Sequence, residues 1–158
     1  MVNLNTMTTC CLVPWLTPVY DRTSSSYYNF GDTNRVADNN IHLAHYALYY
    51  LLIDPTLAGY TVKYKDSLPT IGTINRLENS INSLKDTVIG SNPVGWITLN
   101  ENWVGDTYSF VYTNANNLEK NQEILLSYFY KIYQSQRYCG TYICGETWGN
   151  LFNEYGLQ

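Results

Sequence analysis

Hydrophobic residues along the chain form three groups with the spacing of an amphipathic α-helix, separated by polar stretches that carry many aromatic residues. The middle group has a 4-3-4 spacing and is followed by Gly90, a residue type that commonly ends helices. Its apolar positions are Leu77, Ile81, Leu84 and Val88. The third group has the same character, with one polar interruption at Gln122. Its apolar positions are Leu118, Leu125, Phe129 and Ile132. These two groups predict helices over 74–89 and 115–135.

The first group is more polar but keeps the helical period. Its apolar positions are Val36, Leu43, Ala44, Ala47 and Leu51. Asn40 interrupts this stripe, and the group ends before Asp54-Pro55, because the residue preceding a proline disfavours the helical conformation. The pattern predicts a helix over 33–52.

The three groups are versions of one sequence unit. The segments that align are 30–36, 71–77 and 112–118. One asparagine recurs in all three at equal spacing: Asn34, Asn75 and Asn116. A fixed period of this size is typical of an array of one supersecondary unit that cannot bury its apolar face alone. We therefore predict a mainly α protein. Three helical repeats of 41-residue period, joined by aromatic-rich extended connections, would form a domain over 27–136.

Each copy carries a residue that favours a helix start at the same position. The three aligned residues, which we expect to be the N-caps, are Asp32, Thr73 and Asn114. Arg35 and Arg76 fall in the first turn of their helices, where the helix dipole disfavours a cation. A cation placed there twice indicates a binding partner. That partner is either a carboxylate of an adjoining repeat, such as Glu78 or Glu119, or a group on another subunit.

The connections between the helices are rich in tyrosine and tryptophan. Residues 59–64 and 94–98 could each form a short strand or an extended linker across the helix layer. Tyr64 and Trp103 occupy similar places ahead of their repeats. We expect both to pack between neighbouring helices.

Both ends of the chain differ from the repeats. Residues 1–26 contain prolines, Trp15 and a run of serines, which predicts an extended arm and not a packed element. Residues 137–158 begin with an alternating run over 137–146 that predicts a strand or hairpin, followed by an aromatic tail with Trp148. An unpaired strand at a chain end commonly pairs with a neighbouring subunit, so we expect both arms to contact partners.

The composition of the chain narrows the classes of function that it can have. A net charge of −4 with dispersed lysines and arginines argues against nucleic-acid binding. No stretch reads as a signal peptide or a membrane span, so we expect the chain to stay in the cytoplasm unless lysis or assembly releases it. The 16 tyrosines exceed what a thin helical core requires, and tyrosine suits wet protein or sugar interfaces.

Candidate chemistry is sparse. His42 and His45 could share a helix face, but no acidic residue is placed with them, so we interpret both as partly buried or surface residues. The cysteines lack metal-site spacing; they are either free thiols or, for Cys139 and Cys144, a bridge formed after release. No nucleophile elbow, phosphate loop or carboxylate pair is recognisable. We expect no enzymatic activity, cofactor or metal.

Several short motifs, in order, resemble a known family. They are Asp21-Arg22-Thr23, Asn34-Arg35-Val36 with Asn39-Asn40, Leu68-Pro69-Thr70, Asn75-Arg76-Leu77-Glu78-Asn79, and the segment 140–146. Their order and spacing resemble minor structural proteins of tails and baseplates of phages that infect Gram-positive bacteria. In that family an Asp-Arg-Thr segment precedes helix-opening (D/T)-x-N-R-(I/V/L)-E-x-N units. The likeness covers roughly residues 20–146, with Ala37 standing for the glutamate of the first unit and Asn117 for the arginine of the third.

The resemblance implies a non-enzymatic virion protein made in the host bacterial cytoplasm. Its partners would be other tail or baseplate proteins and further copies of itself around the tail axis. Many family members are longer, so this chain would correspond to the stand-alone adaptor portion. A rival interpretation from the excess of aromatic residues is a receptor-binding module that binds host cell-wall glycans. A cell-wall hydrolase fragment is a third alternative.

Overall fold

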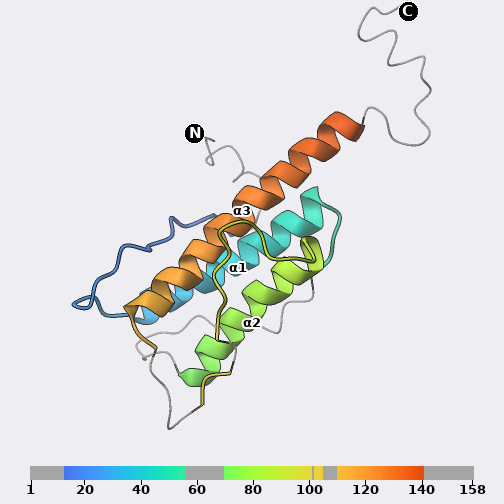
Figure 1. The fold of residues 1–158 in the computed structure, drawn as a ribbon. Helices are drawn as coiled ribbons and strands as arrows, with labels where there is room; N and C mark the ends of the chain where they lie inside the picture. Colours follow the sequence, from blue (N-terminus) through green and yellow to red (C-terminus); the bar gives the residue numbers. More distant parts are fainter. Residues whose placement is uncertain (1–12, 56–69, 101, 105–109, 141–158) are drawn as a thin grey trace, which may run out of the picture.

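The computed structural model describes residues 13–55, 70–100, 102–104 and 110–140, and these form three helices (Figure 1). The helices are α1 (Phe30–Tyr50), α2 (Ile71–Val88) and α3 (Tyr112–Gly140). The prediction of a mainly α protein is confirmed, and the described residues contain no strand. The connection at 94–98 contains a turn and then extended chain, whereas 59–64 lies outside the described residues.

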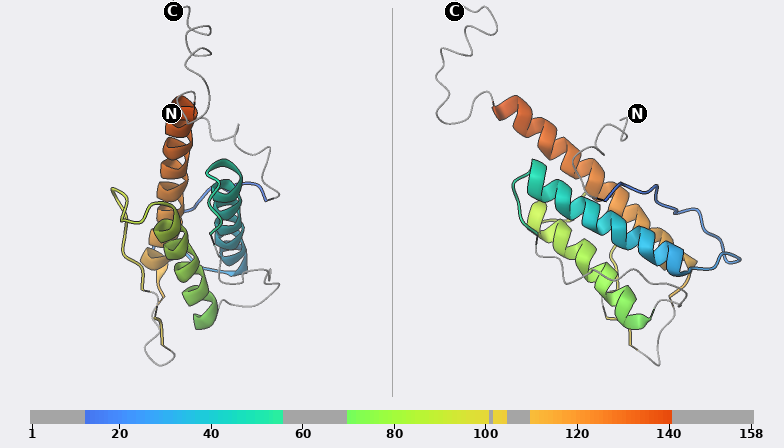
Figure 2. Two further views of the ribbon diagram at one scale, coloured as in Figure 1. Left: turned by 90° about the vertical axis from the view of Figure 1, so that its right-hand side faces the viewer. Right: turned by 180° about the vertical axis from the view of Figure 1, so that it is seen from behind.

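All three helices run in the same direction, with their first turns at one end of the bundle (Figures 1 and 2). Side-chain contacts agree with this direction. Asn40 and Gln122, each ten residues after the start of its helix, are hydrogen-bonded to one another. Tyr50 and Tyr133, at nearly equal depths in α1 and α3, pack edge to face with ring centroids 5.0 Å apart. Because the helices are parallel, each connection has to return along the bundle, which explains why the connections are long.

The core lies between the three helices and is built from the predicted apolar stripes. Most of the stripe positions are almost fully buried: Val36, Leu43, Ala44, Ala47, Leu51, Leu77, Ile81, Leu84, Leu118, Leu125 and Phe129. Tyr46 is also buried, and its ring stacks on that of Phe129 with centroids 6.4 Å apart. Burial of these apolar faces, more than intrinsic helix propensity, stabilises helices of this length.

The helices begin three residues earlier than predicted, so the predicted N-caps are wrong for α1 and α2. Asn29 caps α1, and its side chain accepts hydrogen bonds from the amides of Gly31 and Asp32. Asp32 occupies the third helical position and accepts a bond from the Asn29 amide at 3.0 Å, which completes a capping box. Thr70 likewise caps α2.

The remaining two predicted caps lie at the same third helical position. Thr73 contacts the capping hydroxyl of Thr70 at 3.0 Å. Asn114 accepts a hydrogen bond from the amide of Val111, at 3.0 Å, just before α3 begins. The alignment of these residues therefore predicted equivalent positions but assigned them the wrong role.

The carboxyl ends of the helices also differ from expectation. Residues 137–140, predicted to start a strand, continue α3; the rest of the predicted strand and Trp148 lie outside the described residues. Gly90 follows α2 with a φ of +74°, as expected of a glycine that ends a helix. Leu52 takes the corresponding left-handed conformation after α1, with a φ of +56°, which is uncommon for a residue with a side chain.

Candidate functional site

The chain before α1 lies along the helices and is held there by side chains. We call residues 13–22 the strap. Asn39 of α1 binds the backbone of Leu16 twice: it accepts the amide at 2.8 Å and donates to the carbonyl at 2.9 Å. Asn116 of α3 binds Arg22 in the same way, at 3.2 and 3.0 Å. The prediction that this part of the N-terminal arm is not packed is therefore wrong, although it is extended.

The chain before α3 is held by the same kind of contact. Asn121 of α3 accepts the amide of Ile97 at 3.0 Å and donates to its carbonyl at 2.7 Å. Asn75 of α2 accepts the amide of Trp103 at 2.9 Å and donates to its carbonyl at 3.0 Å. An asparagine side chain offers one acceptor and a donor group, so it satisfies both polar groups of one backbone residue.

The two sets of contacts correspond in position. Asn39 and Asn121 each lie nine residues after the start of their helices, and Asn75 and Asn116 each lie four residues after the start. In both connections the two bound residues are six apart, namely Leu16 and Arg22 or Ile97 and Trp103. Two asparagines of the repeat motif, Asn75 and Asn116, therefore hold extended backbone against the helices, and Asn39 and Asn121 do the same.

A glutamate accompanies each of the two asparagines near the helix starts. Glu119 of α3 accepts from the Arg22 guanidinium at 2.5 Å and from the Val19 amide at 2.6 Å. Glu78 of α2 accepts from the indole Nε1 of Trp103 at 2.8 Å. Both glutamates are buried. Each asparagine and its glutamate thus bind the same residue. Asn116 holds the backbone of Arg22 and Glu119 its side chain. Asn75 holds the backbone of Trp103 and Glu78 its side chain.

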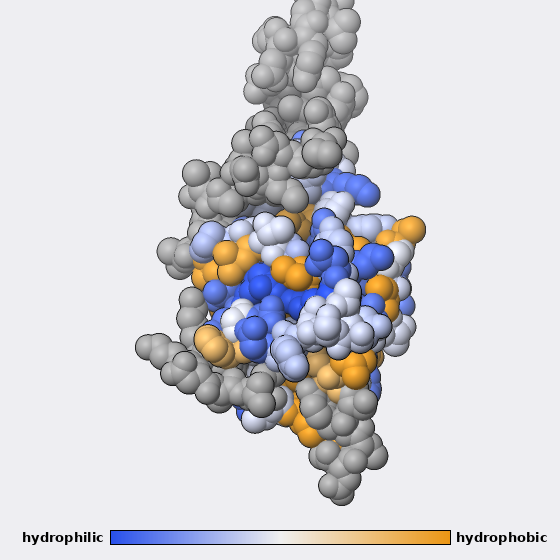
Figure 3. All heavy atoms as spheres, turned by 90° about the vertical axis from the view of Figure 1, so that its left-hand side faces the viewer, coloured by the Kyte–Doolittle hydropathy of each residue, from blue (hydrophilic) through white to orange (hydrophobic). Residues whose placement is uncertain are grey.

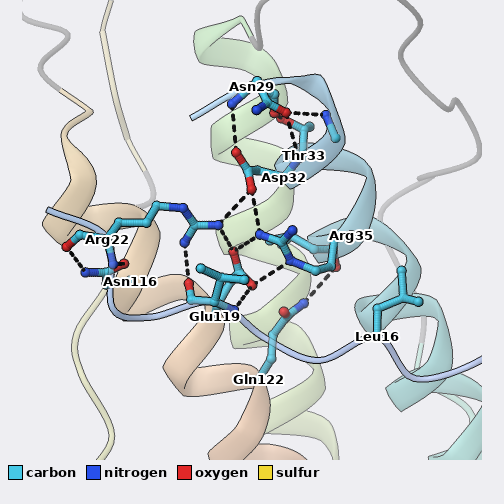
Figure 4. Close-up of polar contacts among 12 residues, drawn as sticks. Leu16, Arg22, Asn29, Asp32, Thr33, Arg35, Asn116, Glu119 and Gln122 are labelled. Carbon is cyan, nitrogen blue, oxygen red and sulfur yellow. Dashed lines mark hydrogen bonds and ion pairs between the residues drawn. The ribbon is translucent and has the colours of Figure 1, made fainter. Parts of the chain in front are cut away.

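Arg22, Asp32, Arg35 and Glu119 form one cluster in which two cations face two carboxylates (Figure 4). The Arg35 guanidinium binds Glu119 through two nitrogens, at 2.9 and 2.8 Å, and Asp32 at 2.6 Å. Arg22 reaches Asp32 at 2.9 Å and also donates to the carbonyl of Val19. Because Glu119 is fully buried, these charge-assisted bonds replace the water that it loses.

The cluster confirms one of the two predicted roles for Arg35, although Arg35 and Arg76 lie in the second turn of their helices and not in the first as predicted. Arg35 pairs with Glu119 of another helix, as expected of a structural ion pair between adjoining segments. Arg76 is exposed, and the described residues include no ion-pair partner for it. The third copy has Asn117 at this position, so the aligned positions do not share one role.

Protonation in the cluster follows from these contacts. Burial alone would raise the pKa of Asp32, but hydrogen bonds from the Asn29 amide and from both arginines outweigh it and lower the pKa. Burial would lower the pKa of Arg35, yet the bonds to Glu119 and Asp32 raise it. The charged forms of these two residues are thus the stable ones. Both carboxylates of the cluster are engaged by arginine.

A second buried polar layer lies one turn further along the bundle. The side-chain amide of Gln122 donates to Asn40 at 2.6 Å and to the carbonyl of Val36 at 2.7 Å. Asn40 donates to the carbonyl of Leu77 at 3.4 Å, which joins all three helices. Asn40 and Gln122, the two interruptions of the predicted stripes, are distant in sequence and meet in this layer.

His42 supports the start of the strap. Its Nδ1 lies 3.0 Å from the carbonyl of Val13, which makes Nδ1 the protonated nitrogen. The Trp15 ring packs edge-on to the imidazole, with centroids 5.5 Å apart. His42 is fully buried, and among the described residues its Nε2 has no hydrogen-bond partner. Burial lowers the pKa of His42.

The described residues include no group of three or more His, Cys, Asp or Glu side chains placed to hold a metal ion. An open hollow of about 380 Å³ lies on α3 beside the turn that follows α2. It is lined by Val94, Glu123, Ile124, Ser127, Tyr128 and Lys131. The Lys131 ammonium lies 5.0 Å from the centre of the Tyr128 ring, and the Tyr128 hydroxyl accepts the Val94 amide, so this ring is already engaged.

Of the residues singled out in the sequence, Asp32, Arg35, Asn116 and Trp15 meet around the strap. Asn75 holds the second connection instead, and Asn34 also takes part in an interaction. Sequence reasoning missed Asn39, Asn121 and Gln122. The available signal was their spacing, because the interval between Asn39 and Asn121 is twice the repeat period.

Comparisons of the chain with family models, curated proteins and solved structures found no match. Within the described part of the chain, no helix combines the length and the apolar character needed to cross a bilayer.

Proposed function

We propose that this chain is a non-enzymatic structural protein of a phage or phage-tail-like particle, an adaptor in the tail, baseplate or fibre attachment that acts through protein contacts. The proposal rests on the sequence resemblance and on one structural observation: the motif asparagines and glutamates bind the chain's own backbone and side chains. In this role the three repeat units form a preorganised body. Several copies would surround the tail axis, as is usual for symmetric assemblies.

The helix starts support the equivalence of the units, because residues 30, 71 and 112 are equally spaced and follow the period of the sequence repeat. Two charged side chains of the described residues are engaged within the chain: Glu119 holds Arg22 of the strap, and Arg35 pairs with Glu119. A body of this kind presents its outer surface to partners without needing to rearrange, which lowers the cost of binding.

Exposed apolar side chains provide surface for such contacts at both ends of the bundle. Tyr27 and Phe30 lie where α1 begins, and Leu48, Tyr49 and Leu52 lie where it ends. Figure 3 shows apolar patches separated by hydrophilic residues on the side toward which α1 and α3 begin. Mixed surfaces of this type are common in protein interfaces that are not permanently buried.

The alternative is a module that binds cell-wall glycans, and exposed tyrosines favour it. Tyr27 is 90% exposed and Tyr49 56% exposed, so both rings offer a face to a ligand. Titration with solubilised host wall glycan, followed by intrinsic fluorescence, tests this alternative. A saturable change that Tyr49→Ala removes would favour glycan binding over the adaptor role.

The adaptor role is tested by asking whether the protein is part of a particle. Particles released from lysing host cells are purified on a density gradient, and the chain is quantified by mass spectrometry against the major tail protein. We expect a fixed ratio across the particle peak. Matched epitope-tagged variants, Tyr49→Ser at an exposed end and Thr87→Ser on the exposed surface of α2, locate the contact. A chain that is abundant in the lysate but absent from the particle peak would contradict the proposal.

A further inference from the structure

The side chains that hold the strap recognise mainly its backbone. Asn39, Asn116 and Glu119 bind amides and carbonyls of Leu16, Val19 and Arg22. His42 adds a bond to the carbonyl of Val13. We call these four side chains the strap site. Binding by backbone groups suits any extended peptide, as in recognition by strand addition.

Two features make the strap site selective for one kind of peptide. Glu119 and Asp32 accept hydrogen bonds from the Arg22 guanidinium, so the strap site favours a peptide with an arginine at the position of residue 22. Trp15, seven residues earlier, packs edge-on to His42 and joins the edge of the hydrophobic core. A suitable ligand is therefore an extended peptide with an aromatic residue followed, seven positions later, by an arginine.

The strap is joined to α1 by a short exposed turn. Residues 23–27 are all exposed, and they include three consecutive serines. The hydrogen bonds of this turn are local: the Ser26 amide donates to the Thr23 carbonyl at 2.9 Å, and the Thr23 amide donates to the Ser26 hydroxyl at 3.1 Å. Among the described residues this turn is the link between the strap and α1, so a change in its backbone would allow residues 13–22 to move away from the helices.

We propose that the strap site is a peptide-binding site that takes the strap of a second copy of this chain. In a single molecule the site is filled by its own strap. At high local concentration two copies exchange straps, and each site is completed by Arg22 of the other copy. Exchange of an identical element in this way forms dimers without any new kind of contact. The inference stands on the contacts of the strap and does not depend on a role in a virion.

The first experiment measures binding of a fluorescent peptide that spans residues 13–22 to the full-length chain carrying Arg22→Ala. This substitution removes the ion pair that holds the protein's own strap and keeps all four side chains of the strap site, with Arg35 still bound to Glu119. A linked strap competes at an effective concentration of about millimolar, so the wild-type chain should bind the peptide at least about tenfold more weakly than the variant. A peptide with Arg22→Ala should bind the variant chain more weakly than the wild-type peptide.

Matched variants identify the site. Adding Asn39→Ala to the Arg22→Ala chain should reduce peptide binding, whereas adding Asn121→Ala, the corresponding residue of the second connection, should leave it unchanged. Equal loss in both would contradict the proposed site. Should the Arg22→Ala chain be unfolded by circular dichroism, Val19→Pro replaces it, because proline lacks the amide hydrogen that Glu119 binds in the strap and the change keeps Arg22.

The second experiment tests exchange between copies. Replacing Ser24, Ser25 and Ser26 with proline in the full-length chain stiffens the turn and hinders the strap from folding back. Light scattering after size-exclusion chromatography should then show a larger dimer fraction than for the wild type, and Arg22→Ala should abolish the increase. A proline variant that stays monomeric, or a dimer insensitive to Arg22→Ala, would overturn the proposal.

Discussion

At the scale of single residues, the buried Glu119 carboxylate joins α3 both to α1 and to the strap. It receives Arg35 from α1 and both Val19 and Arg22 from the strap. A carboxylate buried to this degree is stable only while its donors remain in place. The stability of the fold should therefore be far more sensitive to these donors than to similar residues at the surface.

Replacing Arg35 with alanine should lower the free energy of unfolding by about 2 kcal/mol. The full cost of breaking a buried ion pair, about 3–5 kcal/mol, is reduced because Arg35 is partly exposed and Arg22 still binds Glu119. Arg76→Ala, at the aligned position of α2, is the matched control and should change the free energy by less than about 0.5 kcal/mol. Urea denaturation followed by circular dichroism measures both. Equal losses in the two variants would show that the ion pair contributes nothing special.

The sequence predicted a carboxylate partner for Arg35, but the reason was wrong: Arg35 is the sixth residue of α1, beyond the first turn where the helix dipole disfavours a cation. The sequence did not reveal the partners of Asn39 and Asn121. An asparagine that binds backbone carries no signal about which segment it binds. The path of the connections decides this, and only the parallel arrangement of the helices defines that path.

At the scale of elements, periodicity predicted the three helices and their buried faces but misplaced their ends. The α1 start contains two residues suited to capping, Asn29 and Asp32, and sequence inspection chose the second because it aligned with Thr73. The structure uses both residues in one capping box. The alternating pattern at 137–146 predicts a strand or hairpin, yet residues 137–140 continue α3. An existing helix extends easily by one more residue, so the α3 helix that begins at Tyr112 continues through the first residues of this short alternating segment.

Replacing Leu52 with glycine should stabilise the protein by about 0.5–1 kcal/mol. Leu52 adopts a left-handed conformation that costs a non-glycine residue about 1–2 kcal/mol, and part of the gain is lost to the greater freedom of glycine when unfolded. Its side chain is 86% exposed, so little packing is removed. Leu52→Ala keeps the backbone penalty and should leave stability nearly unchanged. If thermal denaturation shows glycine and alanine to be equivalent, the conformation of residue 52 is not strained.

At the scale of the whole molecule, the groups with shifted pKa values make stability depend on pH at both extremes. His42 and Asp32 have pKa values lowered by folding, so their stabilising contributions are present above their unfolded pKa values and are lost as the pH falls. Tyr28 behaves in the opposite sense. Burial raises its pKa, so its contribution is present below about pH 10 and is lost as the pH rises.

Acidification from pH 7 to pH 5 should therefore destabilise the fold, and His42 should account for most of the change. The unfolded chain binds a proton at this imidazole near pH 6.5, whereas the folded chain resists it because a buried Nε2 would gain a hydrogen without an acceptor among the described residues. One such proton makes the free energy of unfolding fall by at most about 1.4 kcal/mol per pH unit. His42→Asn, whose amide can still donate to the Val13 carbonyl, should flatten this slope.

The strap should respond to acid before the helices do, because His42 supports the start of the strap. Hydrogen exchange at low pH should then show earlier loss of protection at the Leu16 and Val19 amides than in the core of α3. Simultaneous loss at all sites would instead show that the strap and the bundle unfold as one unit.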